Sequence, residues 1–374
     1  MTTEVFPAVN HIPTKGLPEG PQCTPKFYVV PVFIPHAGCP HRCIYCDQRG
    51  ITGRSKPPTP KDVHAEINLF LNHCRQDRGF TEISFFGGNF LGLPPKLIGD
   101  YLKVAEGFVA KGLVNGIRFS TRPDTITPEN LRLVGGYHAT TVELGVQSMN
   151  DRVLHLSERG HTAADTRHAV GLLKNRGVQI GLQLMVGLPG DEPALAMASA
   201  RELADMHPDF VRIYPTLVLA QSPLAKQYHN GTYNPMDLNA CVDVTADMVR
   251  VFAASGVRIV RMGLQASEEL NRDTHVLAGP FHPAFGHLVW SKLFLDAVKT
   301  ALSTMGRVPT DLEIGVHPAD ISKMRGIKNH NISELRRSGF ERILVSPSPV
   351  LDNHHISIQG RIYPVIQPFP GSAF

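Results

Sequence analysis

Short apolar runs alternate with longer stretches of helical spacing along most of the chain. The runs are rich in β-branched and aromatic residues, which favour strands. The first six runs lie near residues 27–34, 81–86, 116–121, 140–147, 178–186 and 209–216. Several stretches between them begin with a helix-capping threonine, as at Thr59, Thr127 and Thr162, and a helical stretch at 236–254 precedes a further run at 257–262. A strand followed by a helix, repeated in this way, predicts a parallel sheet with right-handed crossovers.

The pattern divides the chain into three segments. Residues 1–26 are rich in proline and glycine without periodicity, so we expect an irregular N-terminal arm. The repeated strand and helix pattern occupies residues 27–265. Residues 266–374 begin with an aromatic, histidine-rich stretch and continue with two strand-like runs, DLEIGVHP and ERILVSPS, and a helix near 331–338. This last segment is predicted to be a smaller α/β appendage.

The composition is that of a folded protein. The 374 residues are 42% hydrophobic and 19% charged, which excludes disorder along the whole chain. The first residues show no basic segment followed by an apolar run, and no stretch of about 18 consecutive apolar residues occurs. We therefore expect a cytoplasmic protein without a membrane span. The net charge of +4 is too small to indicate a class of partner.

Three of the six cysteines crowd into one short segment, Cys39-Pro-His-Arg-Cys43-Ile-Tyr-Cys46. Pro40 disfavours the α conformation for Cys39, so the segment is predicted to be a loop after the first strand. Three thiolates that hold a [4Fe–4S] cluster leave one iron without a protein ligand. An open coordination position of this kind is what a reactive metal centre needs.

The alternative is a structural zinc site completed by His36 or His41. Such a site usually combines one close cysteine pair with a second, distant pair of ligands, and the sequence shows no distant pair. The spacing therefore favours iron and sulfur over zinc. The three remaining cysteines stand alone, as small buried hydrophobic residues often do. They are Cys23, Cys74 and Cys241.

Glycine and polar residues mark the carboxyl ends of predicted strands, where the active site of a parallel barrel lies. Gly87 and Gly88 end one strand, where the backbone can approach a ligand closely, although a plain turn would also use them. Strand parity places Glu143 and Gln147 on the same side of their strand, which would be the lumen face in a barrel, and Ser148 follows them. We interpret Gln147 and Ser148 as cofactor or substrate contacts; the alternative is a solvated loop.

Further candidates for ribose or substrate contacts stand at strand ends, where structural ion pairs are the alternative. They are Arg122 and Asp124, Arg212 and Tyr214, and Arg261 and Gln265. Four histidines form no ligand spacing and are interpreted as structural or surface residues. They are His287, His317, His354 and His355.

The wider cysteine segment, FIPHAGCPHRCIYCDQRGITG, resembles the radical S-adenosylmethionine enzymes, in which an aromatic residue, here Tyr45, precedes the last cysteine. Further segments resemble the same superfamily in the same order. They are residues 85–94, 120–126, 143–162, 181–191 and 211–218. The combination looks most like the radical domain of the Elongator catalytic subunit, a tRNA-modifying enzyme. The anaerobic coproporphyrinogen oxidases look like more distant relatives.

This resemblance implies an α/β fold, a partial (β/α)6 TIM-like barrel followed by a small C-terminal α/β extension. It implies that Cys39, Cys43 and Cys46 hold a [4Fe–4S] cluster, beside which S-adenosyl-L-methionine binds. Arg159 stands where related enzymes place an arginine that pairs with the S-adenosylmethionine carboxylate, for which a guanidinium is well suited. The residues expected to contact the cofactor are Tyr45, Gly87, Gly88, Asn89, Gln147, Ser148, Arg159, Met185 and Gly187.

Two of these expectations come from the resemblance alone. Asn89 occupies a position where the superfamily often has glutamate or threonine. The strand end that carries Met185 and Gly187 is expected to lie against the adenine. The segment Gly187–Gly190 is not a phosphate loop, because no Lys-Ser/Thr follows it.

The resemblance also implies a reaction. One electron from the cluster cleaves S-adenosylmethionine and leaves a 5′-deoxyadenosyl radical, which abstracts hydrogen from a substrate. We expect a one-electron donor of the flavodoxin or ferredoxin type and tRNA as the candidate substrate. The alternatives are a small-molecule substrate, as in the coproporphyrinogen oxidases, and a non-catalytic metal-containing nucleic-acid-binding module. No acetyltransferase activity is expected, because the residues after 265 show no R/Q-x-x-G-x-G/A loop.

The tail, residues 266–374, has a predicted role of its own. Six or seven strands cannot close a barrel that ordinarily takes eight, so the tail is predicted to cover the gap and position the substrate. It has an aromatic run of Phe281, Phe285, Trp290 and Phe294. It has a basic run of Lys323, Arg325, Lys328, Arg336 and Arg337. These could accept RNA by stacking and phosphate contacts; core packing and a solvated face are the alternatives.

Overall fold

A computed structural model describes most of the chain. The described residues are 27–35, 37–40, 42–47, 56–73, 79–264, 275–305 and 311–366. The predicted arm at 1–26 lies outside these ranges, as do His36, His41, Gln265 and the isolated Cys23 and Cys74. The chain forms two compact units. The first contains residues 1–184, 208–210 and 221–223, and the second contains 185–207, 211–220 and 224–374.

Seven strands form the main sheet, in the order β1-β2-β3-β4-β5-β6-β8. Their bounds are β1 Tyr28–Phe33, β2 Thr81–Phe86, β3 Gly116–Thr121, β4 Ala139–Gln147, β5 Gln179–Val186, β6 Phe210–Pro215 and β8 Arg258–Met262. The pairs from β1 to β5 are all parallel. All seven strands coincide with the predicted apolar runs to within one or two residues, so the predicted parallel sheet is confirmed.

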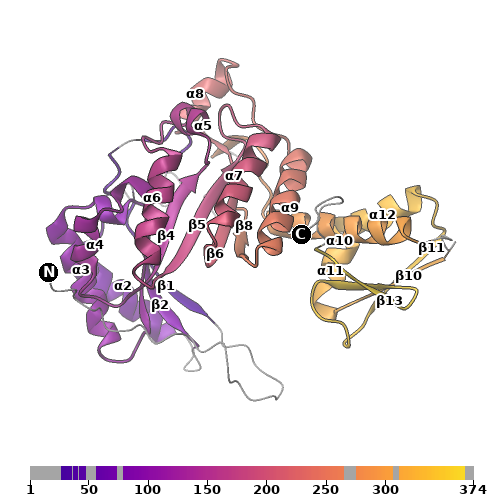
Figure 1. Ribbon diagram of the computed structural model, residues 1–374, viewed down its shortest axis with the longest axis horizontal. Coiled ribbons are helices and arrows are strands. Elements are labelled where there is room, and N and C mark those ends of the chain that lie inside the picture. Colours follow the sequence, from indigo (N-terminus) through magenta and orange to yellow (C-terminus); the bar gives the residue numbers. More distant parts are fainter. Residues whose placement is uncertain are drawn as a thin grey trace. The chain divides into compact units, whose positions relative to one another are not determined.

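The helices of the first unit cover one face of its strands (Figure 1). They are α2 Pro60–His73, α3 Pro95–Val109, α4 Pro128–Val134, α5 Asp151–Leu156 and α6 Ala163–Lys174, with single 3-10 turns at Phe90–Gly92 and Pro123–Thr125. Thr127 accepts a hydrogen bond from the Asn130 amide, and Thr162 forms a reciprocal capping box with Asp165. The predicted starts of these helices are therefore confirmed, and their physical cause is side-chain capping of free amide groups.

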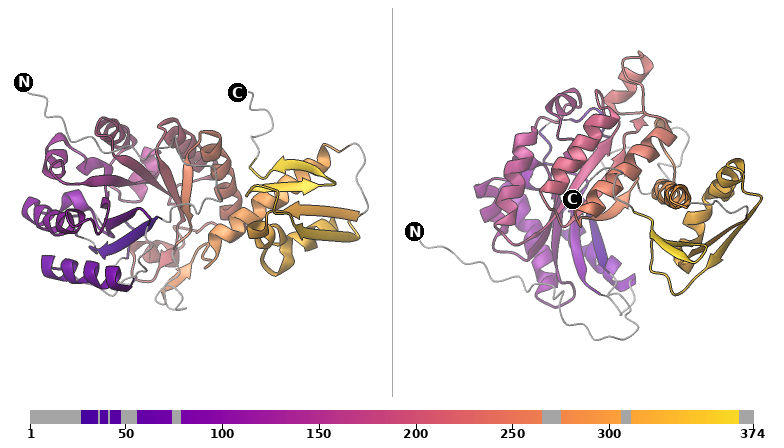
Figure 2. Two further views of the ribbon diagram at one scale, coloured as in Figure 1. Left: turned by 90° about the horizontal axis from the view of Figure 1, so that it is seen from below. Right: turned by 45° about the vertical axis from the view of Figure 1, so that its right-hand side comes forward.

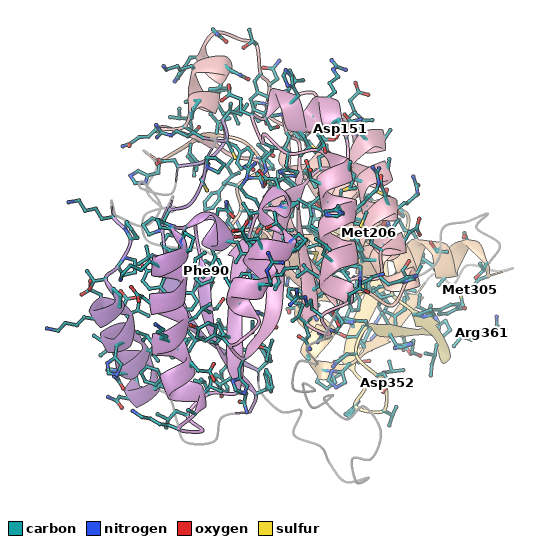
Figure 3. The ribbon with its side chains drawn as sticks, turned by 60° about the vertical axis from the view of Figure 1, so that its left-hand side comes forward. Phe90, Asp151, Met206, Met305, Asp352 and Arg361 are labelled. Carbon is teal, nitrogen blue, oxygen red and sulfur yellow. The ribbon has the colours of Figure 1, made fainter. Side chains whose placement is uncertain are left out.

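A stack of aromatic rings forms the core between α3 and the ends of β2 and β3. The Phe85 and Phe90 centroids are 5.0 Å apart, Phe90 and Phe119 are 4.9 Å apart, and Phe85 and Tyr101 are 5.7 Å apart. All four side chains are fully buried, and Phe90 is labelled in Figure 3. Phe90 follows the Gly87-Gly88-Asn89 segment directly, so the stack fixes where that segment lies.

A buried charged group joins three neighbouring strands. Arg118 on β3 lies with its Nε 3.1 Å from Glu82 of β2 and its Nη1 3.5 Å from Glu143 of β4. Its guanidinium also lies between the rings of Phe27 and Phe210, at 5.2 and 5.1 Å from their centroids. Glu143, predicted to face the barrel lumen, is therefore an ion-pair partner within the protein.

The second unit continues the strand and helix pattern and ends in a small sheet. Its remaining elements are α7 Pro193–Asp205, β7 Val218–Leu219, α8 Pro223–His229, α9 Leu238–Ala254, β9 Val276–Ala278 and α10 Phe285–Ser303. The tail sheet has the order β11-β10-β12-β13. Its strands are β10 Asp311–Val316, β11 Arg342–Pro347, β12 His355–Ile358 and β13 Arg361–Pro364, and its helices are α11 Ile321–Arg325 and α12 His330–Arg337.

The tail is an α/β element, as predicted, with its helices packed against the sheet (Figure 2). β10 pairs parallel with β11 and antiparallel with β12, and β12 and β13 form a hairpin. The aromatic, histidine-rich stretch forms the long helix α10, which was not predicted. Phe285 and Phe294 are buried in it, so core packing is the correct interpretation for both. No helix of the described residues has the length and apolar character needed to cross a membrane.

Part of the basic run of the tail is also structural. The ring of Trp290 stacks on His354 with centroids 4.0 Å apart, and Lys323 Nζ lies 5.5 Å from the Trp290 ring. Lys323 also lies 2.5 Å from the buried carboxylate of Asp320, which accepts a hydrogen bond from the His354 amide. Arg325, Lys328, Arg336 and Arg337 are exposed. Of these four, Arg337 pairs with Glu334 on the same helix, so Arg325, Lys328 and Arg336 are the residues of the run best placed to meet an external partner.

Candidate metal centre and active site

Cys39, Cys43 and Cys46 lie on the loop after β1, as their spacing predicts. Cys39 is exposed, Cys43 is buried and Cys46 is half-buried. Burial, followed by the neighbouring thiols of Cys43 and Cys39, raises the pKa of Cys46 to about 12. Desolvation and Cys43 also raise the pKa of Cys39. The guanidinium of Arg159 acts in the opposite direction on the pKa of both thiols, and a bound metal centre would favour their thiolate forms further.

The donor set fits an iron–sulfur cluster. Three thiols on one loop are the ligands that a [4Fe–4S] cluster takes, with one iron left open. Each thiolate of such a cluster binds a different iron, so the sulfur atoms need not converge on one point. In the described ranges, no three His, Cys, Asp or Glu side chains converge as ligands of a single ion would. The histidines of the zinc alternative, His36 and His41, lie outside those ranges.

The glycine pair at the end of β2 permits close contact with the cysteine loop. Gly87 has a φ of +97°, and a Cβ atom there would lie 2.3 Å from the ring of Phe33. A Cβ atom on Gly88 would lie 2.4 Å from the carbonyl oxygen of Ile34. Both positions therefore require glycine because β1 and its loop approach so closely.

Asn89 connects the cysteine loop to the end of β3. Its Nδ2 donates to the Gly38 carbonyl at 2.8 Å, and its Oδ1 accepts from the Thr121 hydroxyl at 2.6 Å and the Arg122 amide at 3.1 Å. The side chain is fully buried. These bonds occupy Oδ1 and one Nδ2 hydrogen of Asn89. Because they join Gly38 to the end of β3, they hold the cysteine loop in position. The sequence could not reveal this, because Gly38 and Thr121 are 51 and 32 residues away.

Arg159 is buried beside the cysteines. Its Nη1 lies 3.2 Å from Cys43 Sγ, and its Nη2 donates to the Gly145 carbonyl. Arg122 donates in turn to the carbonyl of Arg159 and forms a two-pronged ion pair with Asp124, at 2.9 and 3.0 Å. For Arg122 and Asp124, the ion-pair alternative is therefore confirmed. The arrangement places two guanidinium groups next to the three-thiol loop.

The end of β4 carries the other predicted contacts. Gln147 is buried with a φ of +72°, and its Oε1 accepts from Gln183 at 3.4 Å. Ser148 is buried next to it, and its hydroxyl accepts from the Asn150 amide at 3.1 Å. Gly145 precedes them, and a Cβ atom there would lie 3.3 Å from Arg159 Nη2. The glycine thus allows the guanidinium to reach the strand end.

Several buried polar atoms around this site have no hydrogen-bond partner within the described residues. They are the hydroxyl of Tyr45, Nη1 of Arg122, Nε of Arg159 and Nδ1 of His161. Buried polar groups are nearly always paired, so a group of orphaned atoms indicates a place where a ligand supplies the missing partners. His161 was not predicted; its position two residues after Arg159, in the same segment, was the available signal.

Met185 and Gly187 belong to the second unit. Met185 is half-buried and Gly187 is buried with a φ of +80°. The Gly187 amide donates to Asp191 at 3.0 Å, and its carbonyl accepts from the Tyr233 hydroxyl at 2.7 Å. Burial raises the pKa of Asp191 to about 6. Neither Asp191 nor Tyr233 was predicted.

The last predicted pairs also lie in the second unit. Arg212 Nη1 is 3.5 Å from the Tyr214 hydroxyl, and Arg261 is half-buried on β8. Arg212 lies in the middle of β6, and Tyr214 and Arg261 lie next to the last residues of β6 and β8; the roles of these residues stay predictions. The first unit therefore contains the three cysteines and seven of the nine predicted contacts. They are Tyr45, Gly87, Gly88, Asn89, Gln147, Ser148 and Arg159.

The sequence matches two family models over the regions that contain these sites. Residues 33–201 match the Radical SAM superfamily, and residues 208–294 match the Radical_SAM C-terminal domain. The chain belongs to the radical SAM superfamily, which consists of enzymes. The family implies a [4Fe–4S] cluster and S-adenosylmethionine, for which the three-thiol loop is a suitable site.

Similar proteins fall in the predicted subgroup. The chain is 35% identical over 258 residues to the tRNA uridine(34) acetyltransferase of Methanocaldococcus infernus, covering 58% of this chain and 48% of that protein. It is 28% identical over 264 residues to Elongator complex protein 3 of Saccharomyces cerevisiae, covering 58% and 47%. The chain thus spans about half the length of these relatives. The resemblance to the Elongator catalytic subunit family is confirmed.

A solved structure agrees in fold. The archaeal Elp3 of Methanocaldococcus infernus with an N-terminal deletion has a TM-score of 0.57 and 23% identity, covering 74% of this chain and 63% of that chain. The predicted fold class is confirmed: a parallel sheet curled into a half-barrel, with a C-terminal extension.

Proposed function

We propose that the chain binds one [4Fe–4S] cluster through Cys39, Cys43 and Cys46 and cleaves S-adenosylmethionine reductively to act on tRNA. The observation that carries the proposal is the three-thiol loop with a buried guanidinium 3.2 Å from Cys43. When bound, the cluster supplies one electron, which cleaves S-adenosylmethionine to a 5′-deoxyadenosyl radical that abstracts hydrogen from the substrate. A flavodoxin or ferredoxin type protein would supply that electron.

The residues of the chain bind and orient the cofactor in this proposal. Arg159, held by Arg122 through its carbonyl, supplies positive charge for the amino acid carboxylate, and Gly87 and Gly88 supply close-lying backbone. Gln147, Ser148, Tyr45, Met185 and Gly187 are the further contacts. Asn89 acts indirectly, because it holds the cysteine loop in position through the Gly38 carbonyl. Residues 27–265 form the radical core and 266–374 the appendage, and a tRNA substrate would place the protein in the cytoplasm. That the tail covers the barrel gap stays a prediction.

Metal analysis tests the cluster. Anaerobically reconstituted protein should hold about four irons per chain and absorb light as an oxygen-sensitive cluster does. Serine in place of Cys39, Cys43 or Cys46 should abolish iron binding. Cys241→Ser is the matched control, because Cys241 lies buried in α9 and should leave the iron content unchanged. One tightly bound zinc and no iron would refute the proposal.

The substrate proposal rests on the relative that is named as a tRNA uridine(34) acetyltransferase. It also rests on exposed basic side chains of α11, of α12 and of the turn between them. Phosphate contacts release counterions, so tRNA affinity should fall steeply between 50 and 200 mM salt. Arg325→Glu with Lys328→Glu should weaken tRNA binding and leave S-adenosylmethionine cleavage intact. Lys323 is unsuitable for this test, because it pairs with the buried Asp320.

A matched control separates a local effect from a change in net charge. Lys103→Glu with Lys111→Glu alters two exposed lysines of the first unit and should leave tRNA binding nearly unchanged. Binding of tRNA that is absent or independent of salt would contradict the tRNA proposal and favour a small-molecule substrate.

A further inference from the structure

A buried arginine donates a hydrogen bond to one of the three cysteine sulfurs. Nη1 of Arg159 lies 3.2 Å from Sγ of Cys43, and both residues are buried. A guanidinium group has donors and no acceptor, so this contact is an N–H···S hydrogen bond from a cation to sulfur. Cys39 and Cys46 lie within electrostatic range of the same guanidinium. One cation therefore acts on all three proposed ligands.

The protein fixes the guanidinium of Arg159 in this position. Nη2 of Arg159 donates to the Gly145 carbonyl, and the backbone carbonyl of Arg159 accepts from Arg122. The backbone amide of Arg159 donates to the Leu154 carbonyl at 3.0 Å, which ties the loop after α5 to that helix. A buried donor that is already in place need not reorganise when the charge on its acceptor changes.

No carboxylate of the described residues pairs with Arg159. Its side-chain partners are the Cys43 sulfur and the Gly145 carbonyl oxygen. The neighbouring Arg122 differs, because it forms a two-pronged ion pair with Asp124. Buried charges are screened much less than exposed ones. The positive charge of Arg159 therefore acts mainly on whatever the cysteine sulfurs bind.

Reduction of a bound cluster adds one electron, which a one-electron donor supplies, and no covalent bond of the protein forms or breaks. The added negative charge lies next to the Arg159 cation, so the cation stabilises the reduced state more than the oxidised state. Hydrogen bonds to the sulfur atoms help to set the reduction potential of such clusters. We propose that Arg159 raises the reduction potential of the cluster through its hydrogen bond to Cys43. The inference rests on the proposed function, because it concerns the cluster proposed there.

Two substitutions of Arg159 separate its charge from its hydrogen-bond geometry. Arg159→Met removes the charge and every donor and keeps a long, unbranched side chain. Arg159→Lys keeps a positive charge as a compact ammonium group but loses the planar fork that reaches Cys43 and Gly145 together. Arg152→Met is the matched control, because Arg152 is exposed on α5.

A redox titration of anaerobic, cluster-loaded protein, followed by EPR, measures the midpoint potential. S-adenosylmethionine is left out, so a change in its affinity cannot affect the result. At a fixed potential, Arg159→Met should lower the ratio of reduced to oxidised cluster about tenfold, equivalent to about 59 mV for a one-electron couple. Arg159→Lys should show a smaller shift in the same direction, and Arg152→Met should keep the wild-type potential. An unchanged or higher potential in Arg159→Met would overturn the inference.

A second measurement tests the hydrogen bond in the wild type, so a failure of Arg159→Met to hold a cluster does not end the test. When arginine is labelled with the heavy nitrogen isotope, a guanidinium nitrogen should show hyperfine coupling to the electron spin of the reduced cluster. Arg159→Lys should lose this coupling, and Arg152→Met should keep it. A residue that only supports the fold would give no such coupling. Its absence from the reduced wild type would contradict the inference.

The outcomes distinguish this inference from the proposed function. A wild type that holds one zinc, or no metal, would overturn the proposed function and this inference with it. A wild type with about four irons per chain, whose potential is the same as that of Arg159→Met, would overturn the role of Arg159 in the potential alone.

Discussion

Nη1 of Arg159 lies 3.2 Å from Sγ of Cys43, although the two residues are 116 positions apart in the chain. The loop after α5 and the loop after β1 are thus joined at the proposed metal centre, and the Ile44 amide joins them again by donating to the Ser157 carbonyl at 3.3 Å. Arg159 therefore both stabilises the cysteine loop and presents charge to the cofactor site.

Arg159→Ala should weaken S-adenosylmethionine binding about 10- to 150-fold, because a charge-assisted hydrogen bond contributes about 1.5–3 kcal/mol. Equilibrium dialysis on cluster-loaded protein measures the change. Arg152→Ala, an exposed arginine on α5, is the control. Unchanged affinity would remove Arg159 from the cofactor site and leave the cluster assignment standing.

Asn89→Ala should lower the free energy of unfolding by about 1–3 kcal/mol, because it leaves buried partners of Asn89 unpaired. It should also weaken iron retention, since the Gly38 carbonyl loses its anchor. Denaturant unfolding and iron content measure the two effects. Asn234→Ala, at an exposed position, is the control. A stable variant that retains all its iron would show that Asn89 does not hold the loop.

Asp191→Asn should change how stability depends on pH. The folded pKa of Asp191 is raised to about 6, above an unfolded value of about 3.9. Ionisation of this group therefore opposes folding. The protonated Asp191 carboxyl stabilises the folded wild type below about pH 4, and this stabilisation is lost as the pH rises from about 4 to 6. The Tm difference, variant minus wild type, should increase over that range and stay constant above it. A flat difference, like that expected for the exposed Asp205→Asn, would contradict the shift.

Trp290→Ala should destabilise the tail without affecting the cluster. It removes the stack on His354 and the ring beneath Lys323, and truncation of an aromatic side chain in such a place should cost about 1–3 kcal/mol. Hydrogen exchange should quicken in α10 and β12, with the iron content unchanged. Exchange rates that stay the same in both elements would show that the stack contributes little.

The strands were predictable because each is a short apolar run, and the helix starts because threonine caps them. The helix α10 was not predictable, because its buried residues do not follow a simple helical spacing and its histidines and aromatic residues obscure the period. The hairpin of β12 and β13 turns at Gln359-Gly360, both with positive φ. Gln-Gly is a weaker turn signal than Asn-Gly, so this hairpin was missed.

The site was predictable only where its residues are close in sequence or match a motif. The cysteines satisfy both conditions. Asn89 was expected to touch the cofactor, but its partners come from β3 and from the cysteine loop. No local pattern predicts such pairing. His161 and Tyr233 were missed for the same reason, since each bonds to a backbone carbonyl on another element.

Arg118 pairs with both Glu82 and Glu143, so the alignment of β2, β3 and β4 depends on two buried ion pairs. A slip of one residue turns each side chain of a strand to the opposite face of the sheet. A slip of β3 would therefore move the guanidinium away and leave two buried carboxylates without a cation. Breaking a buried pair in this way costs about 3–5 kcal/mol. The group thus favours the native alignment of β2, β3 and β4 over alignments shifted by one residue.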